Sequence, residues 1–290
     1  MNLSYVLSGV RQVSLATQRH ELARHHQIKS LSRFVRLQVA TRLLQRSIVI
    51  QFINNVKLIV SYGMTGANGN YYWGLHEYND MAFTIHYMRQ NDLFIDVGAN
   101  IGSYTVLASG VSRARTICFE PVPATIERLR ANIAVNELGA LVEVRKLCIG
   151  SIKSTVKFTT NFDTTNRIAD AYEASIEVPM SKLDDELRDC DPVLIKIDAE
   201  GFDNDVVRGA SALLSRSFPC AIIIETVSAE THRVLEGYGF QLCHYDPRLR
   251  RILLERSVYG NNKLYIRDLS FASMRVSTAP VFNTNGFGNI

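Results

Sequence analysis

The stretch Phe94–Thr105, FIDVGANIGSYT, decides the fold of this chain. A short apolar run leads to Asp96, and glycines at positions 98 and 102 then bracket Asn100. In an open α/β sheet, ligands bind beyond the carboxyl ends of the strands, so this strand-to-helix turn is expected at a ligand crevice. Gly98 and Gly102 would let the backbone approach a ligand closely.

The polar residues around this turn indicate the kind of ligand. Asn100 stands where a dinucleotide-binding loop has its middle glycine, which argues against an NAD-dependent oxidoreductase. Asp96 would repel a phosphate and attract a cation. Glu120 ends the next apolar run, where an acid commonly accepts hydrogen bonds from ribose hydroxyls. A ribose and a cation without phosphate describe S-adenosylmethionine (SAM). The plainer alternative is a strand-turn-helix corner with incidental acids.

Seven apolar runs from Asp92 onward predict an α/β fold: LFIDV, TICFE, LVEVRKLCI, VLIKID, CAIIIE, FQLCHY and KLYIR. The first five are separated by segments long enough for crossover helices, which is typical of a parallel sheet covered on both faces. ATIERLRANIAVN is the clearest helix, with Ile126, Leu129, Ile133 and Ala134 on one side. TVKFTT and ASIEVPM predict extra strands in an insertion. The last two runs lie too close for a helical crossover, so the final strand is expected to be antiparallel.

The sequence patterns divide the chain into four regions. Residues 1–46 predict a basic helical segment, and residues 47–91 a β-hairpin, a glycine-rich loop at GMTGANGN and a lead-in helix near 79–88. Residues 92–270 would form the catalytic domain, and 271–290 a loosely ordered tail. Tyr71, Tyr72 and Trp73 follow the expected loop and would form either a stacking platform for a glycan or part of the hairpin core.

Composition and charge narrow the class of protein. The 290 residues are 47% hydrophobic and 21% charged, as in a folded soluble protein. Five cysteines without a CxxC pair indicate neither a zinc site nor a disulfide framework, and favour the cytoplasm. Residues 1–60 hold nine Lys or Arg against Glu21 alone, a local charge of +8 within a total of +4. This basic segment is either a solvated helix face or a contact for anionic membrane or an acidic partner. The net acidic remainder argues against nucleic-acid binding.

Five motifs in order resemble the FkbM family of SAM-dependent methyltransferases: FIDVGANIGSYT, FEPVPATIERLRANIAVN, SKLDDEL, LIKIDAEGFDNDVVRGA and AIIIE. The resemblance implies a class I, Rossmann-like methyltransferase fold with a seven-stranded sheet in the order 3-2-1-4-5-7-6. It also implies methyl transfer to a hydroxyl of a sugar or polyketide-type acceptor.

The resemblance further implies the residues that hold SAM. Asp96, Gly98, Asn100 and Gly102 would hold its methionine end, Glu120 its ribose, and the loop Cys148–Ser151, with Ile149, would border its adenine. The chain departs from the family at Ser151, where an acid is usual, and at Asp203, where a glutamate is usual. The shorter Asp203 would instead cap the following helix.

IKIDAEG is the candidate catalytic stretch. Lys196, Asp198 and Glu200 alternate along a strand end, so the two carboxylates would share a face. Asp198 would contact substrate or the sulfonium, and Glu200 would accept the proton of the acceptor hydroxyl. Alternatively, Glu200 caps a helix or pairs with Lys196, or the acids join Glu225 around Mg²⁺. His76 is a further candidate base, although a lone histidine is more often structural. No metal site is assigned.

These patterns together predict a SAM-dependent O-methyltransferase whose acceptor is a sugar in a glycan or glycan precursor. A lipid or secondary metabolite as acceptor is an alternative. So is a non-catalytic SAM-fold module that docks a partner through the basic N-terminus. The sequence does not specify the oligomeric state.

Overall fold

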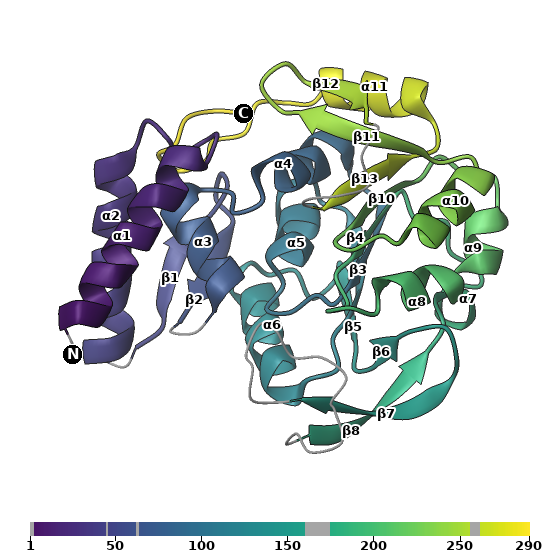
Figure 1. Ribbon diagram of the computed structural model, residues 1–290, viewed down its shortest axis with the longest axis horizontal. Helices are drawn as coiled ribbons and strands as arrows, with labels where there is room; N and C mark the ends of the chain where they lie inside the picture. The colour runs from purple at the N-terminus through teal and green to yellow at the C-terminus, as the bar shows by residue number, and fades with distance from the viewer. Residues whose placement is uncertain (1–2, 45, 62–63, 160–174, 256–261) are drawn as a thin grey trace.

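The computed structural model describes residues 3–44, 46–61, 64–159, 175–255 and 262–290. Its centre is an eight-stranded sheet in the order β12-β11-β13-β10-β9-β3-β4-β5 (Figure 1). The strands are β3 (Leu93–Val97), β4 (Arg115–Phe119), β5 (Val142–Arg145), β9 (Leu194–Ile197), β10 (Ala221–Ile224), β11 (Gln241–Asp246), β12 (Arg251–Leu254) and β13 (Lys263–Ile266).

The predicted strand order is confirmed. The seven apolar runs take the order 3-2-1-4-5-7-6, and β13 runs antiparallel to both β10 and β11. The expected number of strands is wrong by one, because Arg251–Leu254 pairs with β11 as an eighth strand at the edge. This segment lies in the short connection between the last two runs, and a two-strand turn needs fewer residues than a helical crossover.

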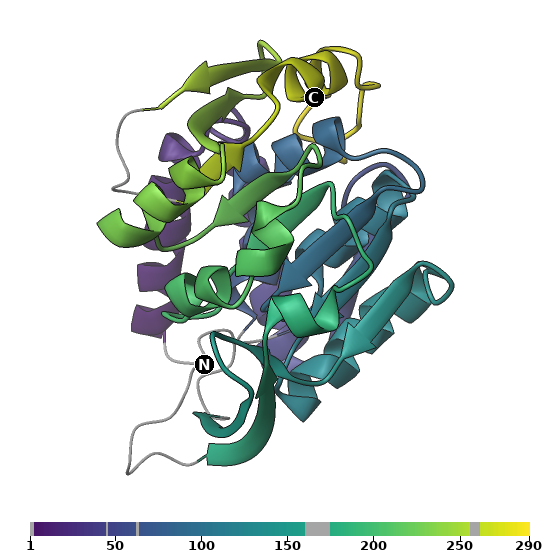
Figure 2. The ribbon, with the colours of Figure 1, turned by 90° about the vertical axis from the view of Figure 1, so that its right-hand side faces the viewer.

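The insertion between β5 and β9 forms a separate three-stranded sheet in the order β6-β8-β7, visible in the lower part of Figure 2. Its strands are β6 (Cys148–Ile149), β7 (Ser154–Thr159) and β8 (Ser175–Ser181), so the two strands expected in the insertion are confirmed. The third apolar run is not one strand, because its second half leaves the main sheet and pairs with β8. Helix α7 (Leu183–Glu186) then leads to β9.

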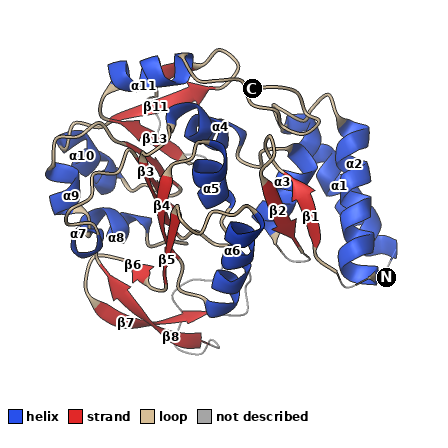
Figure 3. Cartoon of the chain, turned by 180° about the vertical axis from the view of Figure 1, so that it is seen from behind, coloured by secondary structure: helices blue, strands red, loops and turns tan. Residues whose placement is uncertain are grey.

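The N-terminal region forms a helical pair beside a small hairpin (Figure 3). Helix α1 (Leu3–Arg19) packs on α2 (Gln27–Gln38), which continues into a π-helical turn η1 (Val39–Leu43). The hairpin pairs β1 (Ile48–Gln51) with β2 (Lys57–Val60), as expected, and Asn54 in its turn has φ 49°. Among the described residues, no helix is both long and apolar enough to cross a membrane.

The expected loop at GMTGANGN is wrong, because Thr65–Trp73 forms helix α3. Glycine and asparagine are weak helix formers, so packing rather than propensity stabilises this helix. Its Asn70 accepts a hydrogen bond from the backbone of His76 and donates one to Ser103. Tyr71 and Tyr72 are buried, which places them in the core rather than on a platform.

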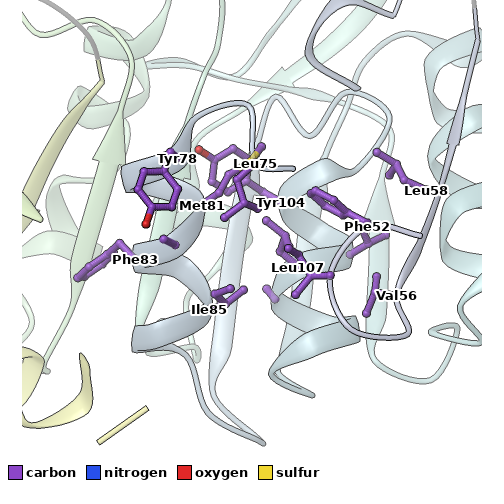
Figure 4. Close-up of a cluster of buried hydrophobic side chains, with 14 of the residues drawn as sticks. Phe52, Val56, Leu58, Leu75, Tyr78, Met81, Phe83, Ile85, Tyr104 and Leu107 are labelled. Atoms are coloured by element: carbon purple, nitrogen blue, oxygen red, sulfur yellow. The ribbon is translucent and has the colours of Figure 1, made fainter. Parts of the chain in front are cut away.

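Helices cover both faces of the main sheet. One face carries α4 (Tyr78–Tyr87), α5 (Ser103–Val106) with η2 (Leu107–Val111), and α6 (Pro123–Val135); the other carries α8 (Asp203–Arg208), α9 (Ser211–Ser215) and α10 (Ala229–Gly237). Every residue of β3, β9, β10 and β13 is buried. Figure 4 shows α4, α5 and the hairpin meeting in one apolar cluster. The sheet thus has the two-sided burial that its apolar runs predict.

Two details of packing differ from the sequence interpretation. In α6, Ile126, Leu129 and Ile133 are buried, but Ala134 is exposed. Residues 271–290 are not loosely attached: most of helix α11 (Leu269–Ser277) lies there, and the side chains of Phe282, Phe287 and Ile290 beyond it are buried. These apolar residues are spaced among polar ones, so no periodic pattern marked them in the sequence.

Candidate active site

A cleft lies at the carboxyl ends of β3, β4 and β9, where the fold predicts a ligand. It holds about 680 Å³ including its open mouth. Five of the residues predicted to bind cofactor border this cleft, namely Gly98, Asn100, Glu120, Ile149 and Asp198. Asp96 and Gly102 do not border it.

The two glycines act mainly by packing. Gly98 has φ 76°, and a Cβ there would lie 1.9 Å from the backbone oxygen of Asp198. Gly102 has φ 90°, and its Cβ would lie 2.4 Å from Leu129 of α6. Gly98 therefore lets the loops after β3 and β9 touch at the floor of the cleft, whereas Gly102 lets α6 approach α5.

Glu120 is held rigidly at the cleft wall. Its side chain is buried and accepts hydrogen bonds from the backbone N–H groups of Asn100 (3.0 Å) and Val122 (2.9 Å). Burial raises the pKa of Glu120 to about 7. Each carboxylate oxygen has a second acceptor position, so the pair suits the two hydroxyls of a ribose.

Asp96 lies beneath the loop instead of in the cleft. Its side chain is 1% exposed and accepts a 2.6 Å hydrogen bond from Thr105 of α5. Burial raises its pKa to about 6, while the nearby charge of Lys196 opposes this rise. Asp96 therefore fixes the helix after the loop and does not border the space available to a ligand.

An apolar slot closes the far end of the cleft. It is formed by Leu147, Cys148 and Ile149 together with Phe158 of β7 and Phe202. Ile149 lies where the adenine contact was expected. Phe158 was missed from the sequence, since its only signal was the alternation in TVKFTT.

Ser151 takes no part in this slot. Its hydroxyl donates to Asp205 at 3.0 Å, and the residue does not border the cleft. The loop Cys148–Ser151 therefore contributes its first two residues to the slot and turns away afterwards.

The candidate catalytic stretch does not continue as a strand. β9 ends at Ile197, and Glu200 has a left-handed φ of 47°. Ala199 borders the cleft together with Asp198 and Glu200, so the expected alternation stops at the strand end.

Asp203 holds this turn in place. One of its carboxylate oxygens accepts from the Ala199 N–H at 2.7 Å, and the other accepts from the Thr226 N–H at 3.2 Å. Asp203 is fully buried and makes no capping bond to its own helix, so the expectation of a helix cap is wrong. The residue joins the loops that follow β9 and β10.

Lys196 supplies a buried positive charge behind the cleft. Its ammonium lies 2.6 Å from an Asp198 oxygen and 4.7 Å from the ring centre of Tyr104. Burial opposes this charge, but Asp198, Glu77 and Asp96 outweigh it and raise the pKa of Lys196. The ion pair holds the Asp198 side chain at the cleft wall.

A second, larger pocket adjoins the cleft and is strongly polar. It holds about 1710 Å³ including open space, and its polar lining includes His76, Glu77, Asp80, Glu225, Glu255, Asn262 and Lys263. Glu77 is fixed by bonds from the Tyr104 hydroxyl at 2.6 Å and the Asn262 amide at 3.1 Å. Burial and the charge of Glu77 raise the pKa of Asp80 to about 7.

The linings of the two spaces approach each other where β9 and β10 end. Ile197 and Ile224 are partners in register, and the Glu225 N–H donates to the Ile197 oxygen at 3.1 Å. When protonated, the Glu225 carboxyl of the polar pocket hydrogen-bonds to Asp198 of the cleft. Partial desolvation and the charges of Asp198, Glu200 and Asp203 raise the pKa of Glu225 to about 8. The sequence interpretation had considered Glu225 only as a metal ligand.

His76 borders the polar pocket and not the cleft. Its ring stacks on Trp73 at 5.3 Å between centroids, and burial lowers its pKa, so the imidazole is neutral near pH 7. Within the described parts of the chain, no three His, Cys, Asp or Glu side chains gather in a way that would hold a metal ion.

The family model for the methyltransferase FkbM domain matches residues 96–258, more than half of the chain. The chain belongs to the FkbM methyltransferase family. Its methyl donor is accordingly SAM, and the fold is that of the class I SAM-dependent methyltransferases. The cleft fits this donor by its own chemistry: Glu120 suits the ribose, the slot around Ile149 suits adenine, and Asp198 suits a sulfonium.

Several solved structures are similar to this FkbM methyltransferase. The precorrin-6Y C5,15-methyltransferase of Geobacter metallireducens is 16% identical, covering 66% of this chain and 87% of its own, with a TM-score of 0.38. An rRNA methylase of Streptococcus thermophilus is 12% identical, covering 66% and 94%, with a TM-score of 0.38. A SAM-dependent O-methyltransferase of Thermotoga maritima is 9% identical, covering 66% and 63%, with a TM-score of 0.37. No curated protein sequence matches the chain. These values say nothing about the acceptor.

Proposed function

We propose that this FkbM methyltransferase transfers the methyl group of SAM to a hydroxyl of a sugar in a glycan or glycan precursor. The observation that carries the proposal is the contact between Asp198 of the cofactor cleft and Glu225 of the polar pocket, which brings the linings of the two spaces together. Sugar hydroxyls both donate and accept hydrogen bonds, and carboxylates, amides and a lysine line that pocket. A sugar therefore satisfies its lining better than an apolar acceptor would.

The reaction needs a proton acceptor on the acceptor side. SAM supplies an electrophilic methyl group on a sulfonium, which a neutral alcohol attacks poorly unless its proton is removed. Asp198, paired with Lys196, places a carboxylate at the cleft wall. We assign proton acceptance to the ionised form of Glu225, because this residue borders the polar pocket. Its pKa of about 8 means that this form, and with it the rate of transfer, increases as pH rises toward 8.

The other two catalytic candidates then take different roles. Glu200 borders the cleft and not the polar pocket, so it contributes negative charge near the donor. His76 borders the polar pocket, where its neutral ring would bind the acceptor. Substituting Glu200 and His76 separately tests these two roles.

The test uses methyl-labelled SAM and a lysate of the source organism, fractionated into polysaccharide, lipid and small molecules after incubation with the purified protein. The expected result is label in the polysaccharide fraction that survives base treatment, as an ether does and an ester does not. Acid hydrolysis should then release an O-methyl sugar. Label confined to the lipid or small-molecule fraction would contradict the sugar assignment, and SAM binding without transfer to any fraction would contradict catalysis.

The role of Glu225 has its own comparison. E225Q should bind SAM in calorimetry but lose about 100-fold or more in turnover, as general-base loss does. E230Q, an exposed position on the following helix, serves as the matched control and should retain activity. If E225Q turned over normally while E200Q did not, Glu200 would be the base.

A further inference from the structure

A groove between α2 and β1 gathers positive charge at the end of the molecule opposite α9 and α10 (Figure 3). Its lining includes Lys29, Arg33 and Arg36 but no carboxylate. It holds about 1160 Å³ including open space and shares no lining residue with the cofactor cleft or the polar pocket. The methyl-transfer proposal does not use this groove.

Two of its cations are held in place by neutral groups. The Lys29 ammonium donates to the backbone oxygen of Gly286 at 2.8 Å, and Arg33 donates to those of Tyr71 (2.8 Å) and Asn285 (2.7 Å). Carbonyl oxygens satisfy the hydrogen bonds of a cation but leave its charge uncompensated. The cations are therefore fixed in position and still attract an anion.

The charges in the groove also repel one another. Desolvation, followed by the charge of Arg33, lowers the pKa of Lys29. Desolvation lowers the pKa of Arg33; Tyr71 opposes this fall, and the charge of Arg36 adds a smaller lowering effect. No acid occurs between Leu22 and Arg46 to relieve this repulsion from within the helix. An external anion in the groove would relieve it.

Exposed aliphatic side chains lie in the groove at Val49 and next in sequence to its cations on α2, where Ile28 precedes Lys29 and Val35 precedes Arg36. On α2, Ile28 is 87% exposed and Val35 48%, and Val39 continues the same helical line. On β1, Val49 is 58% exposed. Rows of aliphatic side chains beside fixed cations are the pattern of a surface that lies at a membrane interface.

We propose that the groove and its aliphatic rim dock the protein on an anionic lipid bilayer. Lipid headgroup anions would lie among Lys29, Arg33 and Arg36, and the side chains of Ile28, Val35 and Val49 would enter the boundary of the acyl chains. A single-stranded nucleic acid would instead call for exposed aromatic rings on which bases stack, and the rim has none.

The test measures co-sedimentation of the full chain with phosphatidylcholine vesicles and with vesicles of equal parts phosphatidylcholine and phosphatidylglycerol. We expect binding to the anionic vesicles alone, weakening as salt shortens the range of the charges. K29Q/R36Q should lower the partition coefficient about 30-fold, which corresponds to about 1 kcal/mol for each cation. I28S/V35S should lower it at least about tenfold, because it removes the aliphatic contact.

R115Q/R130Q is the matched control, since it removes two exposed positive charges from β4 and α6. It should bind the anionic vesicles as the unaltered chain does. SAM affinity, measured on the same samples, should be equal for all variants, so that lost vesicle binding is not lost folding. Equal binding to both kinds of vesicle, an equal loss in R115Q/R130Q, or binding of inorganic phosphate without binding to vesicles would each overturn the proposal.

Discussion

Replacing Gly98 by alanine should separate the two loops that form the floor of the cofactor cleft. The added Cβ would lie 1.9 Å from the Asp198 oxygen, whereas real Cβ contacts essentially never fall below 3.0 Å. The obstacle is backbone, so the loop must move. Left-handed strain of about 1–2 kcal/mol and overpacking of about 1–3 kcal/mol together predict a loss of about 2–5 kcal/mol in the free energy of unfolding.

G201A is the control that isolates the contact with Asp198. Gly201 also has a positive φ, of 93°, but a Cβ there would meet nothing within 4 Å. Backbone strain alone should therefore lower the free energy of unfolding of G201A, by about 1–2 kcal/mol. Urea denaturation gives both values, and calorimetry should show SAM binding abolished in G98A and retained in G201A. Equal destabilisation of the two variants, or normal SAM affinity in G98A, would refute the account of the cleft floor.

Three further results are expected. E120Q should weaken SAM binding about 100-fold, because the new side-chain NH₂ group must face the backbone N–H of Asn100 or Val122 and one acceptor for the ribose is lost. Calorimetry measures this affinity. The control E127Q, on the exposed side of α6, should bind SAM normally. Burial raises the pKa of Glu120 and of Asp80 to about 7, so the folded state holds more protons than the unfolded state. The free energy of unfolding should then fall as pH rises through about 4.5 to 7. Calorimetric melting of the ligand-free protein should show this as a falling melting temperature. A melting temperature independent of pH would contradict the prediction. D203N should cost about 1–3 kcal/mol in urea denaturation by breaking one of two bonds to loop amides, whereas D185N on exposed α7 should cost little.

Local pattern predicted most strands of the main sheet, and the family resemblance predicted their order. The runs at β3, β4, β9 and β10 are continuously apolar because parallel strands are buried on both faces, and the spacing between runs distinguishes crossovers from hairpins. The same reasoning located Gly98, Asn100 and Glu120, because the ends of neighbouring parallel strands converge at one edge. The sequence could not show that Thr65–Asn70 is helical, since its glycines and asparagines disfavour a helix and packing around Asn70 and His76 stabilises one.

The sequence by itself determined the sheet order and the family, and with these the methyl donor. Tertiary structure decided which side chains of the motifs border ligand space. Asp96 and Gly102 do not border the cleft. Glu225 lies in the polar pocket beside Asp198 of the cleft, although the sequence had suggested it only as a possible metal ligand. The physical reason is that strand periodicity is a local property, whereas the polar pocket joins α4, β10 and β13, which are distant in sequence and are brought together only by the folded sheet.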